Sequence, residues 1–119
     1  MTHYFKLNDS SFAKIANGTK TIELRLYDEK RQRINTGDKI VFSNSKGNTL
    51  LVIVTDLHRF AGFKELYDNL DLLKCGYDKS NVSTASYTDM EEYYSAADIK
   101  KYGVLGIEIK KIEEPEGSL

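Results

Sequence analysis

Three ionisable side chains of both signs stand close together near the start of the chain. Lys20, Glu23 and Arg25 follow one another at spacings of three and two residues. A carboxylate beside an ammonium group shifts the proton affinity of both groups, and such a pair can act as acid and base on a water molecule. A guanidinium can bind a phosphate through two hydrogen bonds, whereas an ammonium acts as a point charge. These residue types therefore suit either the binding of an anionic ligand or acid–base chemistry on it.

Alternation of apolar and polar residues predicts that this stretch is a β-strand. Apolar residues at positions 22, 24 and 26 alternate with Glu23, Arg25 and Tyr27, so the two sets point to opposite faces. Gly18 can end a preceding short helix and deliver Lys20 to the start of the strand. A second interpretation stays open, because amphipathic strands often carry Glu and Arg on a solvated face, where ion pairs contribute little.

A longer pattern surrounds these residues and resembles a known family. Gly18, Lys20, Glu23 and Arg25 fit the G-x-K-x-x-E-x-R pattern of the ASCH family. The stretches KTIELRLYDEKRQRINTGDKIVF and MEEYYSAADIKKYGVLGIEI are also similar to small prokaryotic ASCH proteins, and the resemblance extends over residues 4–112. It implies a PUA-like fold with a cleft for RNA or a nucleoside-like ligand.

The resemblance also implies which residues line this cleft. The motif positions supply its polar lining, and tyrosines at three positions are candidates for stacking on a base. The expected ligand-binding residues are Gly18, Lys20, Glu23, Arg25, Tyr27, Tyr93 and Tyr94. The expected partner is single-stranded RNA or a nucleotide or nucleoside, including a modified one.

An enzymatic alternative comes from the same family. Some small bacterial ASCH proteins are similar to amidohydrolases that remove an acyl group from N4-acetylcytidine, an activity associated with a lysine, a threonine three residues later and a downstream glutamate. Lys20 matches the lysine, but Glu23 stands in the threonine's place; Glu91 and Glu92 are the candidates for the downstream glutamate. Other ASCH proteins are linked to ribonuclease activity. In either hydrolase Lys20 and Glu23 would be the catalytic pair, and a third alternative is a protein-interaction domain with a solvated strand.

Composition limits the partners. The chain has 119 residues and a net charge of −1, which argues against a broad basic surface for long duplexes. A local basic patch remains, with Lys30, Arg31 and Arg33 clustered after the strand. Any nucleic-acid contact is therefore expected to be short, or limited to one nucleotide in a pocket.

Other features of the sequence bear on location, cysteine chemistry and metal binding. There is no apolar run of the length that a membrane span needs and no signal-peptide layout, so a cytoplasmic location is expected. Cys75 is the only cysteine, which excludes an internal disulfide and favours an inert thiol over a nucleophile. His3 is expected in a mobile terminus, and no clustered metal-ligand pattern is present, so neither a metal nor a cofactor is expected. The oligomeric state stays open.

The fold class predicted from the pattern is α+β. We expect one ASCH/PUA-like domain over residues 1–112 and a flexible polar tail over residues 113–119. About five or six strands should form a partly closed barrel with short helices at its ends. Strands are predicted at 4–7, 20–27, 39–43, 49–60 and 104–109, and helices at 12–16, 62–70, 88–94 and 96–102. Residues 71–87 lack periodicity, which predicts a long loop, either a functional lid or a plain surface connection.

Overall fold

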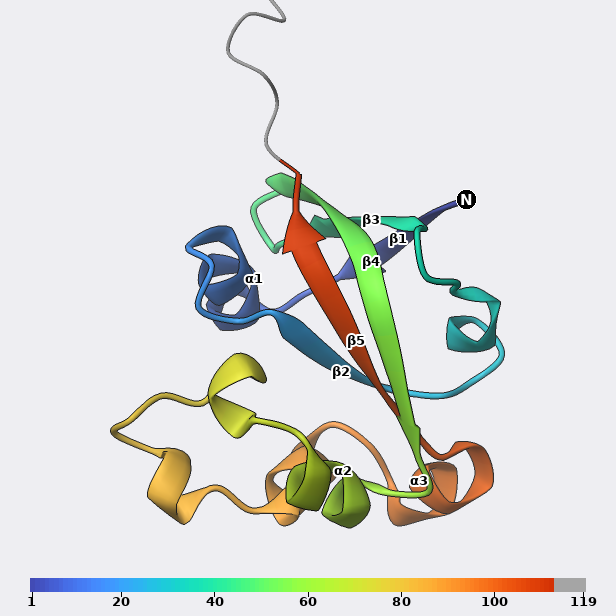
Figure 1. Ribbon diagram of the computed structural model, residues 1–119, viewed down its shortest axis with the longest axis vertical. Coiled ribbons are helices and arrows are strands. Elements are labelled where there is room, and N and C mark those ends of the chain that lie inside the picture. The colour runs from blue at the N-terminus through green and yellow to red at the C-terminus, as the bar shows by residue number, and fades with distance from the viewer. Residues whose placement is uncertain (113–119) are drawn as a thin grey trace, which may run out of the picture.

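The computed structural model describes residues 1–112, which form a five-stranded sheet and several short helices (Figure 1). The predicted flexible tail, residues 113–119, lies outside the described residues. The strands are β1 (Thr2–Lys6), β2 (Ile22–Leu26), β3 (Lys39–Ser43), β4 (Thr49–Phe60) and β5 (Val104–Lys111). The α-helices are α1 (Asp9–Ala16), α2 (Phe63–Asn69) and α3 (Ala96–Tyr102), and the 3-10 helices are η1 (Arg31–Arg33), η2 (Leu72–Lys74), η3 (Val82–Thr84) and η4 (Tyr87–Glu92).

The sheet has mixed pairing and curls into a half-barrel. Its strand order is β1-β3-β4-β5-β2, with β1 and β3 parallel and the other neighbours antiparallel. The long strand β4 pairs with β3 through its first half and with β5 through most of its length. A register shift between Val54 and Asp56 interrupts the β4–β5 ladder, and such bulges bend a strand and increase its twist. The predicted α+β class with a PUA-like, partly closed barrel is confirmed.

Local signals in the sequence begin and end the helices. The Asn8 side chain accepts a hydrogen bond from the backbone N–H of Ser11 and so caps α1, and Ser95 caps α3 in the same way. Gly18 follows α1 at φ 84° and Gly103 ends α3 at φ 72°. Because side chains disfavour positive φ, glycine is the residue that allows the chain to leave each helix there.

Two apolar clusters lie on the two faces of the sheet. The first fills the half-barrel around Phe42, Ile40 and Ile107 and is covered by α1. The second lies between the outer side of β2 and the helical segments near the end of β4, where Leu66 of α2 is fully buried (Figure 1). The inner and outer faces of β2 are therefore both covered, and the short strand is buried along most of its length.

The first strand starts earlier than the sequence indicated. It includes His3, which is 8% exposed, and the prediction that His3 lies in a mobile terminus is wrong. The His3 ring contacts Asp38, with Nε2 2.8 Å from Oδ2. The strand β1 also pairs in parallel with β3. Pairing with a strand distant in the sequence, together with this buried contact, orders the segment.

The segment between α2 and α3 contains 3-10 turns but neither an α-helix nor a strand. Its first part, residues 71–87, agrees with the predicted long loop, and the helix expected around residues 88–94 is the 3-10 helix η4. Ser86 and Asp89 form the capping box of η4. In the described part of the chain no helix is long and apolar enough to cross a membrane.

Candidate functional site

A buried ion cluster sits at the start of β2. Lys20 Nζ lies 2.7 Å from Glu23 Oε1, and Arg25 Nε donates to Glu23 Oε2 over 2.8 Å. The two cations thus occupy the two oxygens of one carboxylate. Lys20 is 7% exposed and Glu23 is 4% exposed. This burial excludes the interpretation of the strand as a merely solvated charged face.

The Arg25 guanidinium links the two edge strands of the half-barrel. Its Nη2 donates to the carbonyl oxygen of Lys6 on β1 over 2.7 Å, while Nε holds Glu23. The guanidinium carbon also lies 5.5 Å from the centre of the Phe5 ring, within the range of a cation–π contact. The edge of the guanidinium formed by Nε and Nη2 is therefore already in use and is not available for bidentate binding of a phosphate.

The charge state of Glu23 follows from two opposing effects. Burial alone would raise the pKa of this carboxyl group. The charges of Lys20 and Arg25, with their hydrogen bonds, outweigh burial and hold the pKa of Glu23 below its ordinary value. Glu23 is consequently ionised at neutral pH, and each of its oxygens keeps a lone pair beyond the one that its cation uses.

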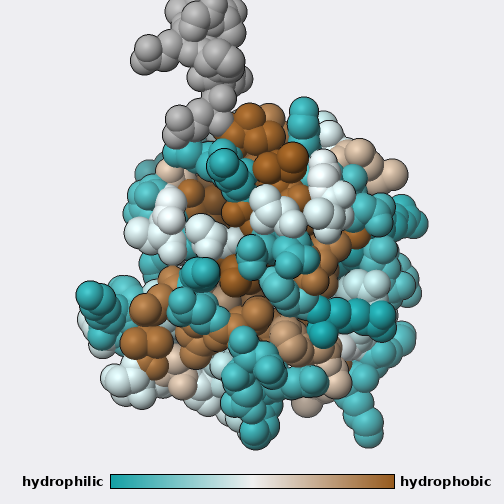
Figure 2. Space-filling model, in the orientation of Figure 1, coloured by the Kyte–Doolittle hydropathy of each residue, from teal (hydrophilic) through white to brown (hydrophobic). Residues whose placement is uncertain are grey.

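The cluster forms the floor of an open cleft of about 770 Å³. One side of the cleft comes from β2, α1 and the end of β1, and the other comes from α2 and the segment between α2 and α3 (Figure 1). Figure 2 shows that apolar residues occur both in the lower half of this face and near its top, with hydrophilic residues between them. The lining includes four cations, Lys6, Lys14, Lys20 and Arg25, and three carboxylates, Glu23, Asp89 and Glu92.

Hydrogen bonds hold the second side of the cleft together. The Tyr77 hydroxyl donates to Asp89 over 2.7 Å and lies 2.7 Å from the Tyr67 hydroxyl. Lys14 on α1 donates to the carbonyl oxygen of Gly76 over 2.7 Å and so ties the loop to the first side. Gly76 has φ 109°, and a Cβ there would lie 3.4 Å from the Lys20 side chain. Within the segment 71–87, residues 75–77 and Asn81 therefore form part of the second side of the cleft.

A phenol and a thiol on this side of the cleft, those of Tyr77 and Cys75, stay protonated at neutral pH. Burial raises the pKa of Tyr77, and its hydrogen bonds with Tyr67 and Asp89 raise it further. Burial also raises the pKa of the Cys75 thiol to about 11, against the opposing charge of Lys20. A thiol with this pKa is protonated at neutral pH, which fits the expected inert cysteine.

The structure brings five of the seven predicted ligand-binding residues together. The cleft is lined by Lys20, Glu23, Arg25, Tyr93 and Tyr94. Tyr93 is 59% exposed, whereas Tyr94 is half-buried and stacks on Phe63 with ring centres 5.9 Å apart. Of the two glutamates considered for a catalytic role, Glu92 lines the cleft and Glu91 does not.

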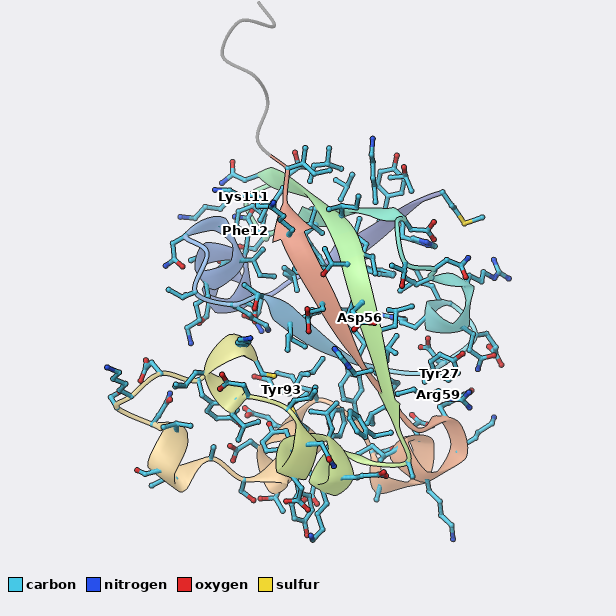
Figure 3. All side chains as sticks on the ribbon, viewed as in Figure 1. Phe12, Tyr27, Asp56, Arg59, Tyr93 and Lys111 are labelled. Carbon is cyan, nitrogen blue, oxygen red and sulfur yellow. The ribbon has the colours of Figure 1, made fainter. Side chains whose placement is uncertain are left out.

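The other two predicted residues lie elsewhere. Tyr27 packs against the core inside the half-barrel, and the Arg59 guanidinium lies 4.1 Å from its ring centre. Figure 3 shows Tyr27 and Arg59 across β4 and β5 from Tyr93. Gly18 lines a separate, smaller cavity beside β5, which Lys20 also borders. This placement removes Tyr27 and Gly18 from the candidate site.

Several residues of the cleft were not predicted from the sequence. Ser11 accepts a hydrogen bond from Lys20 Nζ over 3.2 Å, and Lys14 lies one helical turn away on the same face of α1. The i, i+3 spacing of Ser11 and Lys14 just before the motif was a usable signal. No comparable signal joins Tyr67 to Tyr77, since they come from different segments. Among residues 1–112 no three His, Cys, Asp or Glu side chains are placed to hold a metal ion.

Comparison with known proteins gives a consistent result. The model of the ASCH domain matches residues 5–113. The hypothetical protein PH0355 is 32% identical, with a TM-score of 0.79 over 94% of this chain and 100% of that one. Protein PF0455 from Pyrococcus furiosus is 31% identical, with a TM-score of 0.72 over 96% and 100% of the two chains.

A more distant likeness extends only to the fold. The S128A mutant of ZmASCH from Zymomonas mobilis is 12% identical, with a TM-score of 0.59 over 92% of this chain and 72% of that one. None of the curated proteins matches this chain.

Proposed function

Because the chain belongs to the ASCH-domain family, we propose that its cleft binds a single-stranded RNA segment or a nucleotide. The observation that carries this proposal is the buried cluster of Lys20, Glu23 and Arg25 on the floor of an open, tyrosine-walled cleft. Removing charges from water costs several kcal/mol per ion, roughly, and a purely apolar strand would avoid that cost. Retention of charges facing a cleft fits a role in recognising a polar ligand.

The aromatic residues of the lining suit the base of a nucleotide, and the cationic residues suit its phosphate. A base has a flat π-face, which stacks on aromatic side chains, and Tyr93 offers such a ring at the opening. A phosphate needs a cation that remains accessible, and Lys6 is an exposed cation of the lining. The near balance of cations and carboxylates in the cleft supports a ligand with few phosphates rather than a long duplex.

The hydrolase alternative has less support from the geometry. Glu23 stands where the amidohydrolase relatives carry a threonine, so the cleft lacks a hydroxyl at that position. In its ion pair with Glu23, Lys20 carries its proton and cannot accept another from an attacking group. We therefore rank ligand binding ahead of N4-acetylcytidine hydrolysis or ribonuclease activity.

Titration of purified protein with a short single-stranded RNA and with mononucleotides tests the proposal. We expect binding that weakens as salt rises, with a shallow slope, since few counterions are released. Tyr93→Ala should weaken RNA binding by about 1–3 kcal/mol, the range for loss of one stacked base. Tyr4→Ala is the matched control, because Tyr4 is also exposed, at 67%, and does not line the cleft.

A second pair of variants tests the electrostatic part. Lys6→Ala should lower the salt dependence of binding, whereas Lys46→Ala, also exposed but outside the cleft, should leave it unchanged. Equal losses in Tyr93→Ala and Tyr4→Ala, or no binding by the folded wild type, would contradict the proposal.

A further inference from the structure

The hydroxyl of Ser11 has a fixed donor direction. Lys20 Nζ donates to Ser11 Oγ over 3.2 Å, and an ammonium group has donors only, so Ser11 is the acceptor in this bond. Within residues 1–112 the Ser11 hydroxyl proton has no acceptor. Ser11 lines the cleft, and its proton is therefore free for a ligand.

Lys20 offers a second donor at the same place. Its ammonium carries three protons, of which one meets Glu23 Oε1 and one meets Ser11. The third has no partner among the described residues. Two donors, from Lys20 and Ser11, thus stand side by side on the floor of the cleft.

Glu23 supplies an acceptor next to these donors. Its Oε1 lies 2.7 Å from the same Lys20 nitrogen and has a remaining lone pair. The floor therefore presents two donors beside one acceptor. A complementary ligand carries an oxygen that accepts two hydrogen bonds beside a group that donates one.

We propose that Ser11 is a specificity-determining residue and that the cleft selects keto bases, whose ring carries a carbonyl beside an N–H. The inference rests on the proposed function. A carbonyl oxygen has two lone pairs and can accept from both Lys20 and Ser11, while the adjacent N–H donates to Glu23. Uracil, guanine and hypoxanthine have this edge.

Adenine and phosphates fit the floor less well. The ring nitrogen beside the amino group of adenine has a single lone pair in the ring plane, so it accepts from only one of the two donors and leaves the other unpaired. A phosphate would bring negative charge against the ionised Glu23. A donor of this part-buried pair that is left without a partner lowers the affinity for the ligand, which gives the discrimination.

A pair of nucleosides that differ at one edge tests this inference. Inosine and adenosine share the purine and the ribose but differ in the keto or amino group. Calorimetric titration of the full chain should give an affinity for inosine roughly tenfold above that for adenosine, the factor expected for one donor left unpaired. Ser11→Ala should weaken inosine binding by roughly three- to tenfold and narrow the ratio of the inosine and adenosine affinities.

Controls separate this role from effects on folding. Ser11→Thr keeps a hydroxyl and should retain most of the preference. Ser83→Ala changes an exposed serine of η3 outside the cleft and should alter nothing. Equal binding of inosine and adenosine, or an unchanged affinity ratio in Ser11→Ala, overturns the role of Ser11 while leaving nucleotide binding intact. Absence of any nucleoside or RNA binding by the folded wild type overturns the proposed function itself.

Discussion

Replacing Glu23 by glutamine removes the negative charge that lies between the buried Lys20 and the largely buried Arg25. The side chain keeps its shape, but its amide has one oxygen, whereas the carboxylate serves Lys20 with one oxygen and Arg25 with the other. In Glu23→Gln the amide nitrogen therefore faces a group that also donates. Lys20 then remains buried, and Arg25 largely buried, without a counter-charge from Glu23.

The expected cost is large for a chain of this size. Removing one partner of a buried ion pair destabilises a protein by about 3–5 kcal/mol, against a total stability of about 5–15 kcal/mol for a domain. For 119 residues, an unfolding entropy of about 2.1 cal/mol/K per residue makes 1 kcal/mol correspond to roughly 4 °C. The melting temperature should therefore fall by roughly 12–20 °C.

Urea unfolding and calorimetry of matched variants measure this effect. Asp68→Asn is the control, because Lys64 and Asp68 form an ion pair of similar length, 3.0 Å, with side chains 70% and 63% exposed. Screening by water should make that change nearly neutral. The double variant Lys20→Met with Glu23→Gln should recover part of the loss, since it removes one of the unpaired charges.

The pH dependence gives a second measurement of the same cluster. Burial alone would raise the pKa of Glu23, but Lys20 and Arg25 hold it below its ordinary value of 4.5. A carboxyl group of this kind stabilises the fold above its unfolded pKa, and the contribution is lost as the pH falls through the folded pKa. The difference in unfolding free energy between wild type and Glu23→Gln should thus be full at neutral pH and shrink below pH 4.5. A loss no larger than that of Asp68→Asn at pH 7 would refute the reasoning.

Three further predictions concern other parts of the molecule. Gly103→Ala should cost more stability in urea unfolding than Gly47→Ala, because both positions have positive φ but only at Gly103 would the new Cβ meet a backbone carbonyl oxygen, at 2.9 Å. Asp38→Asn should flatten the loss of stability in acid, because hydrogen bonds from His3 and a backbone N–H lower the pKa of Asp38 to about 2. The contribution of Asp38 to stability is therefore full above pH 3.8 and is lost toward pH 2. An unchanged dependence of stability on pH in this range would contradict the prediction. Cys75, buried and with its pKa raised by burial to about 11, should react slowly with iodoacetamide at pH 8 in the native protein and rapidly in urea; equal rates would show that the thiol is accessible.

Local chemistry in the sequence determined many of the elements. The strand 49–60 and the helix 96–102 occur with the predicted bounds, because continuous apolar runs, Ser95 as a cap and Gly103 as a stop act over a few residues. Alternation along β2 likewise sufficed to place Glu23 and Arg25 on one face, with Lys20 beside them. These features depend on neighbours in the chain, which a sequence displays directly.

The environment of that face was decided by tertiary structure. Alternation cannot tell a solvated face from a covered one, and the curling of the sheet brings Phe5 of β1 against Arg25 and buries the cluster. The same curvature separates Tyr27 from the cleft, although it follows Arg25 by two residues on the same face.

The second side of the cleft depends on contacts between distant segments. Tyr67 and Tyr77 meet through their hydroxyl groups, and Asp89 joins them from η4. Lys14 reaches the backbone of Gly76 across 62 positions of the chain. Nothing in the periodicity of residues 71–87 encodes these partners. Their positions follow from the packing of α2 and η4 on the outer side of β2, because only that packing brings the donors and acceptors within hydrogen-bonding distance.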